Sequence, residues 1–153
     1  MQKVFCIVIV FFGVLASFDI AGQDFKSGDW FVYKSIEDMQ IANVRNESGA
    51  VTGVVCLVSA NSCFAYIATE TTCEPKGKYP FMINSPTGAH TLMGTCLTAP
   101  WAEKEKPAFL YSFDEFASTI AAYESGGTVG FVTPMKNGEF RVFRFSTVGA
   151  TSA

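Results

Sequence analysis

Four cysteines in the middle of the chain limit the folds that it can adopt. They follow one another with six, nine and 22 residues between them, and the fifth cysteine, Cys6, lies inside an apolar N-terminal segment. An even number of cysteines in a small exported domain predicts a framework of two disulfides. The chain must then adopt a fold in which these positions meet in pairs. They are Cys56, Cys63, Cys73 and Cys96.

Residues 1–22 have the order of a secretory signal peptide. Lys3 precedes an apolar stretch at 4–15, and small residues follow that stretch. The stretch is shorter than the roughly 20 residues that span a bilayer as a helix. Cleavage after Gly22 or after Ala16 would leave a small residue at the cut, and we favour Gly22. The alternative is an uncleaved N-terminal anchor.

Cleavage after Gly22 leaves residues 23–153, a length that fits a single β-rich domain in the periplasm or outside the cell. The mature chain contains no second stretch that is long and apolar enough to cross a membrane as a helix. Cys6 would be removed with the signal, and its place inside the apolar stretch excludes it as a lipid-bearing residue at the cleavage boundary.

Three pairings of the four cysteines are possible, and a hairpin favours one of them. Residues 51–59 and 63–69 are β-branched and apolar, with Ala60-Asn61-Ser62 as the turn between them. In such a hairpin Cys56 and Cys63 lie nearly opposite each other, at the separation that a disulfide needs.

The second pair follows from another predicted hairpin. Residues 79–84 and 91–97 flank a turn-rich segment at 85–88, and folding them together brings Cys73 close to Cys96. The rival interpretation is a zinc site, but the three spacings lack the C-x-x-C pairs of zinc knuckles. We therefore expect Cys56–Cys63 and Cys73–Cys96, although sequence alone does not determine connectivity.

One helix is predicted in the C-terminal half. Ser112 is a suitable N-cap, and Glu115 three residues later completes a capping box. Asp114 and Glu115 would then lie in the first turn, where negative charge stabilises the helix dipole and needs no catalytic explanation. Gly126-Gly127 ends the helix. Its apolar stripe comprises Phe113, Phe116, Ala117, Ile120 and Ala121.

The remaining pattern predicts strands. Asn137-Gly138 is a strong turn signal for a final hairpin, and Pro134 indicates that the strand before it is an edge strand or ends early. We expect a mainly β (α+β) domain of about seven to nine strands, arranged as an antiparallel β-sandwich or an open barrel with one helix and two disulfides. The predicted strands are 29–34, 40–45, 51–59, 63–69, 79–84, 91–97, 128–135 and 139–145.

Charge and motifs exclude several classes of function. The net charge is −3 at pH 7 and no basic patch is present, which argues against binding to nucleic acid. The glycines do not form a phosphate-binding loop, and no run of acidic residues or second histidine suggests a metal site. We expect neither a cofactor nor a bound metal.

Four residues are candidates for binding, and none is a convincing catalytic group. His90 is the single histidine, and we expect it on a hairpin tip or strand start, exposed to solvent. Trp101 lies in a polar loop flanked by prolines and could form an exposed contact, whereas Trp30 is expected in the core. Arg141 and Arg144 interrupt an aromatic strand, where they could bind an anion or cover the outer face of an edge strand.

The order of motifs and predicted elements along the chain resembles that of the invasion-associated locus B group of small bacterial periplasmic proteins. A Gly28-Asp29-Trp30 strand opens the mature domain, cysteines and short strands fill the middle, and residues 145–153 are similar to the family's phenylalanine-serine…glycine…alanine ending. Many members carry a cysteine soon after the opening tryptophan, whereas Phe31-Val32-Tyr33 follows here. The disulfide plan can therefore differ. The resemblance implies a β-rich envelope domain without established catalysis and transfers no catalytic residues.

We expect an exported, non-enzymatic protein that binds a protein or an envelope component. A first alternative is an inhibitor of an extracellular hydrolase such as lysozyme, which would present Ser85-Pro86-Thr87-Gly88-Ala89-His90 as a protruding loop. A second alternative is a hydrolase that uses His90 with a nearby carboxylate or serine.

Overall fold

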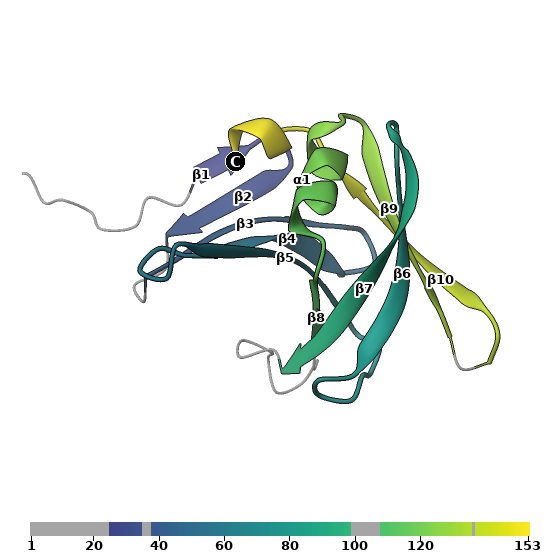
Figure 1. Cartoon of the computed structure of the whole chain (residues 1–153). Helices are drawn as coiled ribbons and strands as arrows, with labels where there is room; N and C mark the ends of the chain where they lie inside the picture. The colour runs from purple at the N-terminus through teal and green to yellow at the C-terminus, as the bar shows by residue number, and fades with distance from the viewer. Residues whose placement is uncertain (1–24, 35–37, 99–107, 136) are drawn as a thin grey trace, which may run out of the picture.

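The computed structural model describes residues 25–34, 38–98, 108–135 and 137–153. Within them the chain forms ten strands, one α-helix and one short 3₁₀ helix (Figure 1). The elements are β1 (Phe25–Ser27), β2 (Trp30–Lys34), β3 (Met39–Arg45), β4 (Val51–Leu57), β5 (Ser62–Thr69), β6 (Lys78–Ser85), β7 (Gly88–Thr98), β8 (Phe109–Phe113), α1 (Phe116–Glu124), β9 (Thr128–Pro134), β10 (Phe140–Ser146) and η1 (Ala150–Ser152).

All ten strands belong to one antiparallel sheet, in the order β1-β2-β3-β4-β5-β8-β7-β6-β9-β10. The sheet is strongly curled, and no pairing joins β1 to β10, so it stays open. This arrangement confirms the expected mainly β fold with one helix, in its open form. No helix of the described residues has the length and apolar character needed to cross a membrane.

Two short strands were not predicted from the sequence. β1 forms a hairpin with β2, and β8 inserts between β5 and β7. The sequence pattern predicts no element for the first three residues of β8, and it places Ser112 and Phe113 at the start of the helix. Pairing on both sides buries Leu110, Tyr111 and Phe113, and this burial determines the strand.

The predicted helix start was wrong. Helix α1 begins at Phe116, its N-cap is Glu115 without a side-chain capping bond, and no acidic residue lies in its first turn. Ser112 belongs to β8, so the capping box does not form. The buried face of the helix also differs from the predicted one, because Thr119, Ala122 and Tyr123 face the core. Of the predicted stripe, Phe116 and Ile120 pack partly against the core, whereas Ala117 and Ala121 are exposed.

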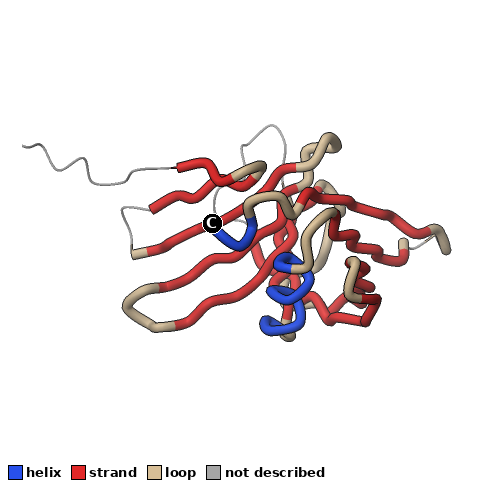
Figure 2. Tube along the Cα trace, turned by 90° about the horizontal axis from the view of Figure 1, so that it is seen from above, coloured by secondary structure: helices blue, strands red, loops and turns tan. Residues whose placement is uncertain are grey.

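The main core fills the concave side of the sheet. Alternate residues of each strand point inward, and α1 packs within the curve, as Figure 1 shows. Viewed from above, η1 lies on the same side of the sheet as α1 (Figure 2). Aromatic rings dominate the centre: Phe113 stacks on Phe131 at 5.3 Å between ring centroids, and Phe81 meets Phe113 edge-on at 5.4 Å.

A smaller cluster lies on the convex side around Tyr66, which is 1% exposed. Tyr66 stands directly opposite Gly53 in the β4–β5 pairing, and Asn43 stands opposite Gly53 on the other side. An aromatic ring next to a strand glycine covers backbone that the glycine leaves bare. Burial raises the pKa of Tyr66 to about 12, and a hydrogen bond from Asn43 opposes that rise.

Both expected disulfides are present. Cys56 and Cys63 are paired residues of the β4–β5 hairpin, with 4.1 Å between their Cα atoms. Cys73 and Cys96 are linked with 6.0 Å between their Cα atoms, and this bond ties the loop at 70–77 to β7. A zinc site at these residues is thereby excluded.

Strand β9 ends at Pro134, beyond the stretch at 130–132 that pairs with β6. The strand pairs with β10 up to Pro134 and so ends one residue before the predicted Met135, and it is not an edge strand, although Pro134 lies beyond the pairing with β6. β9 lies between β6 and β10, and β10 is at the edge of the sheet.

Candidate functional site

His90 lies near the start of β7, directly opposite Ile83 of β6, which agrees with a strand start but not with the solvent exposure that we expected. Opposed residues of antiparallel strands share a face, so His90 shares the concave face with the core residue Ile83. The side chain is partly buried, and its Nε2 is covered without a hydrogen-bond partner among the described residues. A catalytic histidine is normally oriented by such a partner, so this position gives no support to a hydrolase.

Arg141 and Arg144 are both exposed on β10, but they point to opposite faces of the sheet. Arg141 stands opposite Thr133 and donates to the Thr71 hydroxyl at 3.0 Å, which links β10 to the loop at 70–77. Arg144 stands opposite Gly130 on the convex face. The two guanidinium groups are therefore not positioned to bind one anion together.

The remaining predicted contacts are also dispersed. Trp101 falls within 99–107, outside the described residues. Ser85 and Gly88 pair across the β6–β7 turn, so Pro86 and Thr87 alone form the connection. The segment considered as an inhibitory loop is therefore mostly strand with a tight turn.

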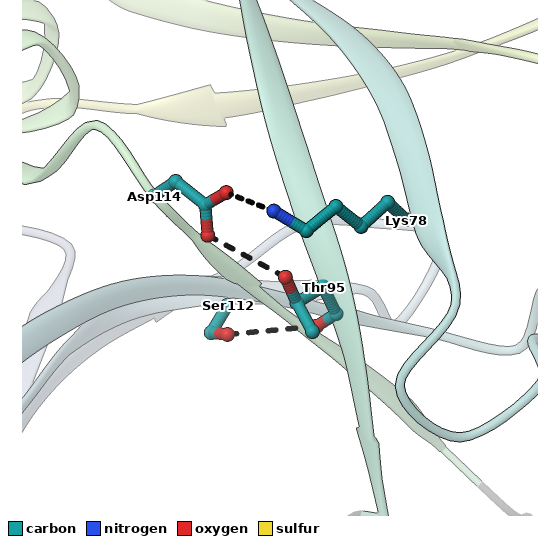
Figure 3. A network of polar contacts seen from close by, with 4 residues as sticks. All are labelled: Lys78, Thr95, Ser112 and Asp114. Carbon is teal, nitrogen blue, oxygen red and sulfur yellow. Dashed lines mark hydrogen bonds and ion pairs between the residues drawn. The ribbon is translucent and has the colours of Figure 1, made fainter.

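A polar network lies on the convex side where β6, β7 and β8 run side by side (Figure 3). The Lys78 Nζ lies 3.0 Å from Asp114 Oδ2, and the Thr95 hydroxyl donates to the other carboxylate oxygen at 3.4 Å. Ser112 Oγ donates to the Thr95 carbonyl at 3.5 Å. Asp114 thus connects strands, and its lysine partner is largely exposed. The network is a structural contact between strands.

The chain after β10 crosses to the first hairpin and closes one end of the curled sheet. Three hydrogen bonds join them: Asp29 N–H to the Val148 carbonyl at 2.9 Å, Ser27 Oγ to the Gly149 carbonyl at 3.0 Å, and Trp30 Nε1 to the Ser146 carbonyl at 3.1 Å. We refer to this contact between residues 27–30 and 146–149 as the terminal clasp.

Two glycines permit the close approach in the terminal clasp. A Cβ on Gly149 would lie 1.9 Å from the Ser27 carbonyl oxygen, and a Cβ on Gly28 would lie 2.3 Å from the Val148 carbonyl oxygen. Both residues also have positive φ, at 93° and 57°, which glycine adopts without strain. The clasp therefore depends on the absence of side chains on both segments.

Next to the terminal clasp, the concave side contains a cavity of about 280 Å³. The strands β2, β3 and β4 form one wall, α1 forms the second, and the C-terminal turn η1 forms the third. We refer to this space as the concave cavity. Its lining residues are Trp30, Val32, Gln40, Ile41, Ala42, Val54, Cys56, Ile120, Tyr123, Glu124, Ala150, Thr151 and Ala153.

Two buried aromatic residues form the inner end of the concave cavity. Trp30 and Tyr123 meet edge-on with 5.2 Å between ring centroids. The Thr52 hydroxyl donates to the Tyr66 carbonyl at 2.6 Å, so its oxygen accepts the Tyr123 O–H, also at 2.6 Å. Burial raises the pKa of Tyr123 far above its usual range, so the phenol is neutral at physiological pH.

The polar residues of the lining are Gln40, Glu124 and Thr151, and all three are exposed to solvent. Sequence reasoning did not identify these residues, and it assigned Trp30 to the core alone. The structure agrees that Trp30 is buried, at 2% exposed, and also places it against the cavity. No local motif could have indicated the site, because its residues come from five separate elements.

The two motifs behind the family resemblance are in contact in the structure. Gly28-Asp29-Trp30 forms one side of the terminal clasp, and residues 146–149 of the C-terminal motif form the other. These two motifs therefore form the terminal clasp, and the first of them contributes Trp30 to the concave cavity.

Comparison with known proteins supports a likeness of fold. No family model matches the chain, and no curated protein sequence matches it. The crystal structure of invasion associated protein B from Bartonella henselae is similar, with a TM-score of 0.56 over 85% of this chain and 92% of that chain. The sequences are 12% identical, a level at which the likeness concerns the fold alone. At the level of fold, the chain therefore resembles an invasion-associated protein B.

Proposed function

We propose that the chain is an exported protein of the cell envelope that acts by binding, without catalysis, and that the concave cavity is its binding site. The cavity carries this proposal, because apolar side chains surround most of its roughly 280 Å³ and few polar groups interrupt them. Small-molecule sites in proteins commonly have this composition, with volumes from about 300 to 1,000 Å³. The size of the concave cavity favours a small ligand.

The structural roles of the reactive side chains support binding over catalysis. All four described cysteines are in disulfides. The Tyr123 hydroxyl is bonded to Thr52, and Asp114 is paired with Lys78. A residue that already has a structural partner is a poor candidate for a nucleophile or a general acid.

Two observations support an envelope location. Disulfides persist in oxidising compartments such as the bacterial periplasm, and this domain has two. The similar protein from Bartonella is described as invasion associated, which fits a role at the cell surface or in contact with a host. The signal-like order of residues 1–22 agrees with both.

The binding proposal is tested by retention from an envelope extract. The immobilised mature chain, residues 23–153, is incubated with the extract, and mass spectrometry identifies the small molecules and proteins that stay bound. Ala42→Phe and Ala150→Phe each place a ring in the concave cavity from a different wall. We expect wild type to retain a species that both variants lose.

Ala121→Phe is the matched control, because Ala121 is exposed on α1 and does not line the cavity. Thermal unfolding followed by circular dichroism establishes that each variant is folded. Equal retention by wild type and by both folded cavity variants would refute the cavity as the binding site.

Export is tested separately by expressing the full chain in a bacterium and measuring the intact mass of the protein in the periplasmic fraction. We expect a mass that begins at Gln23. A protein that stays in the membrane fraction with residues 1–22 attached would support the uncleaved anchor instead.

A further inference from the structure

The concave cavity has a single charged residue among its lining residues, Glu124. Its carboxylate forms no ion pair with any described residue, because the ion pair found among these residues joins Lys78 and Asp114. No lysine or arginine is among the cavity residues. Among the described lining residues, a ligand therefore meets one acidic side chain, that of Glu124, and no basic side chain.

The end of helix α1 adds to the negative potential. Glu124 is the last residue of α1, and the last turn of the helix carries no basic residue. The C-terminal end of a helix has a partial negative charge from its unpaired carbonyl groups. The Ser125 hydroxyl donates to the Ala122 carbonyl at 2.7 Å, which satisfies one of these groups. The remaining field and the carboxylate both favour a cation.

Aromatic rings provide a further contact for a cation. Trp30 and Tyr123 both line the cavity, and Tyr123 immediately precedes Glu124. An ammonium group is attracted to the face of an aromatic ring, most strongly to tryptophan. Because the phenol of Tyr123 stays neutral and its hydroxyl is bonded to Thr52, the ionic partner of such a ligand is Glu124.

We infer that the concave cavity takes a small organic cation, with an ammonium group beside Glu124 and an apolar portion against Val32 and Val54. The inference rests on the proposal that this cavity is the binding site. The residues that line its roughly 280 Å³ include one exposed acidic residue, two aromatic residues and an apolar wall. An amine with a short alkyl or aryl body satisfies all three.

The test compares three probes of similar size and different charge: hexylammonium, hexanol and hexanoate. Each is titrated into the mature chain by isothermal calorimetry. Fluorescence of a Trp101→Phe variant gives a second readout, because Trp30 is then its one tryptophan. We expect hexylammonium to bind most tightly and to change the Trp30 emission. Glu124→Gln should weaken its binding by about three- to fivefold, as expected for a partly exposed charge pair.

Glu47→Gln is the matched control, because Glu47 is exposed in the β3–β4 turn and is outside the cavity. It should leave hexylammonium binding unchanged. Equal binding of all three probes, or unchanged binding in Glu124→Gln, would overturn the cation inference and leave the cavity as an apolar binding site. Absence of binding by any probe would also overturn it, while the retention experiment decides the proposed function independently.

Discussion

The two ends of the curled sheet are held together by different kinds of interaction. At one end the terminal clasp joins residues 27–30 to 146–149 through three hydrogen bonds and a close backbone contact. At the other end the loop at 70–77 is tied to β7 by the Cys73–Cys96 disulfide, and the Tyr111 hydroxyl donates to the Thr71 carbonyl at 3.0 Å. The first contact depends on close backbone packing and the second on a covalent bond. Different substitutions should therefore disrupt each of them.

The location of the concave cavity follows from this difference. The cavity lies at the clasp end, where η1 and Trp30 contribute to its lining. The terminal clasp holds the C-terminal turn by hydrogen bonds, so this turn forms a wall of the cavity without a covalent link to the rest of the sheet. We infer that perturbing the clasp affects ligand binding, whereas perturbing the disulfide end affects stability more than binding.

The largest effect is expected from Gly149→Ala. The new Cβ would overlap the Ser27 carbonyl oxygen, and the positive φ of 93° adds backbone strain. Together these should lower the free energy of unfolding by about 2–5 kcal/mol, measured by urea denaturation. Gly138→Ala is the control, because its φ is also positive but no atom lies within 4 Å of the added Cβ. It should cost about 1–2 kcal/mol, and equal losses in both variants would argue against the clasp.

The disulfide end should respond most to removal of Cys73–Cys96. The two disulfides close loops with sequence separations of 23 and 7 residues. The chain-entropy relation then gives a loss of about 3.4 kcal/mol for the Cys73→Ala/Cys96→Ala variant and about 2.4 kcal/mol for Cys56→Ala/Cys63→Ala. Urea denaturation measures both. Trypsin should also cleave faster at Lys76 in the first variant, and unchanged cleavage there would show that the loop is held by other contacts.

The sequence predicted the contacts that are local in the chain. Each disulfide follows from a hairpin, since Cys56 and Cys63 are directly opposed in β4–β5. The clasp was not predicted, because Ser27 and Gly149 are 122 residues apart and no local pattern joins them. The cavity residues were missed for the same reason: curvature of the whole sheet brings Gln40, Val54 and Glu124 together.

β8 and the start of α1 illustrate another limit of sequence patterns. Ser112 and Glu115 match a capping box, and taken alone this local pattern predicts the start of a helix. Burial of Phe113 between β5 and β7 is stronger, so Ser112 and Phe113 become strand. The helix then begins later and turns a different face to the core. Periodicity found the helix but not its start or its buried side.

Alkaline pH should weaken both ends through buried tyrosines. Burial raises the pKa of Tyr111 to about 12 and also raises the pKa of Tyr123. In the unfolded chain tyrosine ionises near pH 10, so above this pH the unfolded state loses protons that the folded state keeps. The free energy of unfolding should therefore be unaffected by these groups below about pH 10 and fall as the pH rises to about 12.

The two ends can be separated in this pH range. A single tyrosine contributes at most about 1.4 kcal/mol per pH unit. Tyr123→Phe should reduce the slope of stability against pH at least as much as Tyr111→Phe, because burial raises the pKa of Tyr123 further than that of Tyr111. Urea denaturation at pH 8, 10 and 11 measures both slopes. A slope that neither variant changes would assign alkaline unfolding to other groups.

The smallest effect is expected from the ion pair on the convex side. The Lys78 and Asp114 side chains are 62% and 48% exposed, so solvent screens the 3.0 Å contact between them. Lys78→Gln should therefore lower the free energy of unfolding by about 0.5 kcal/mol at low salt and by less at high salt. The double variant Lys78→Gln/Asp114→Asn completes a mutant cycle that isolates the pair from the Thr95 hydrogen bond. A coupling energy far above this value would mean that the convex network helps the disulfide to hold this end of the sheet. Non-covalent contacts would then contribute at both ends, and the two ends would differ less than the disulfide alone suggests.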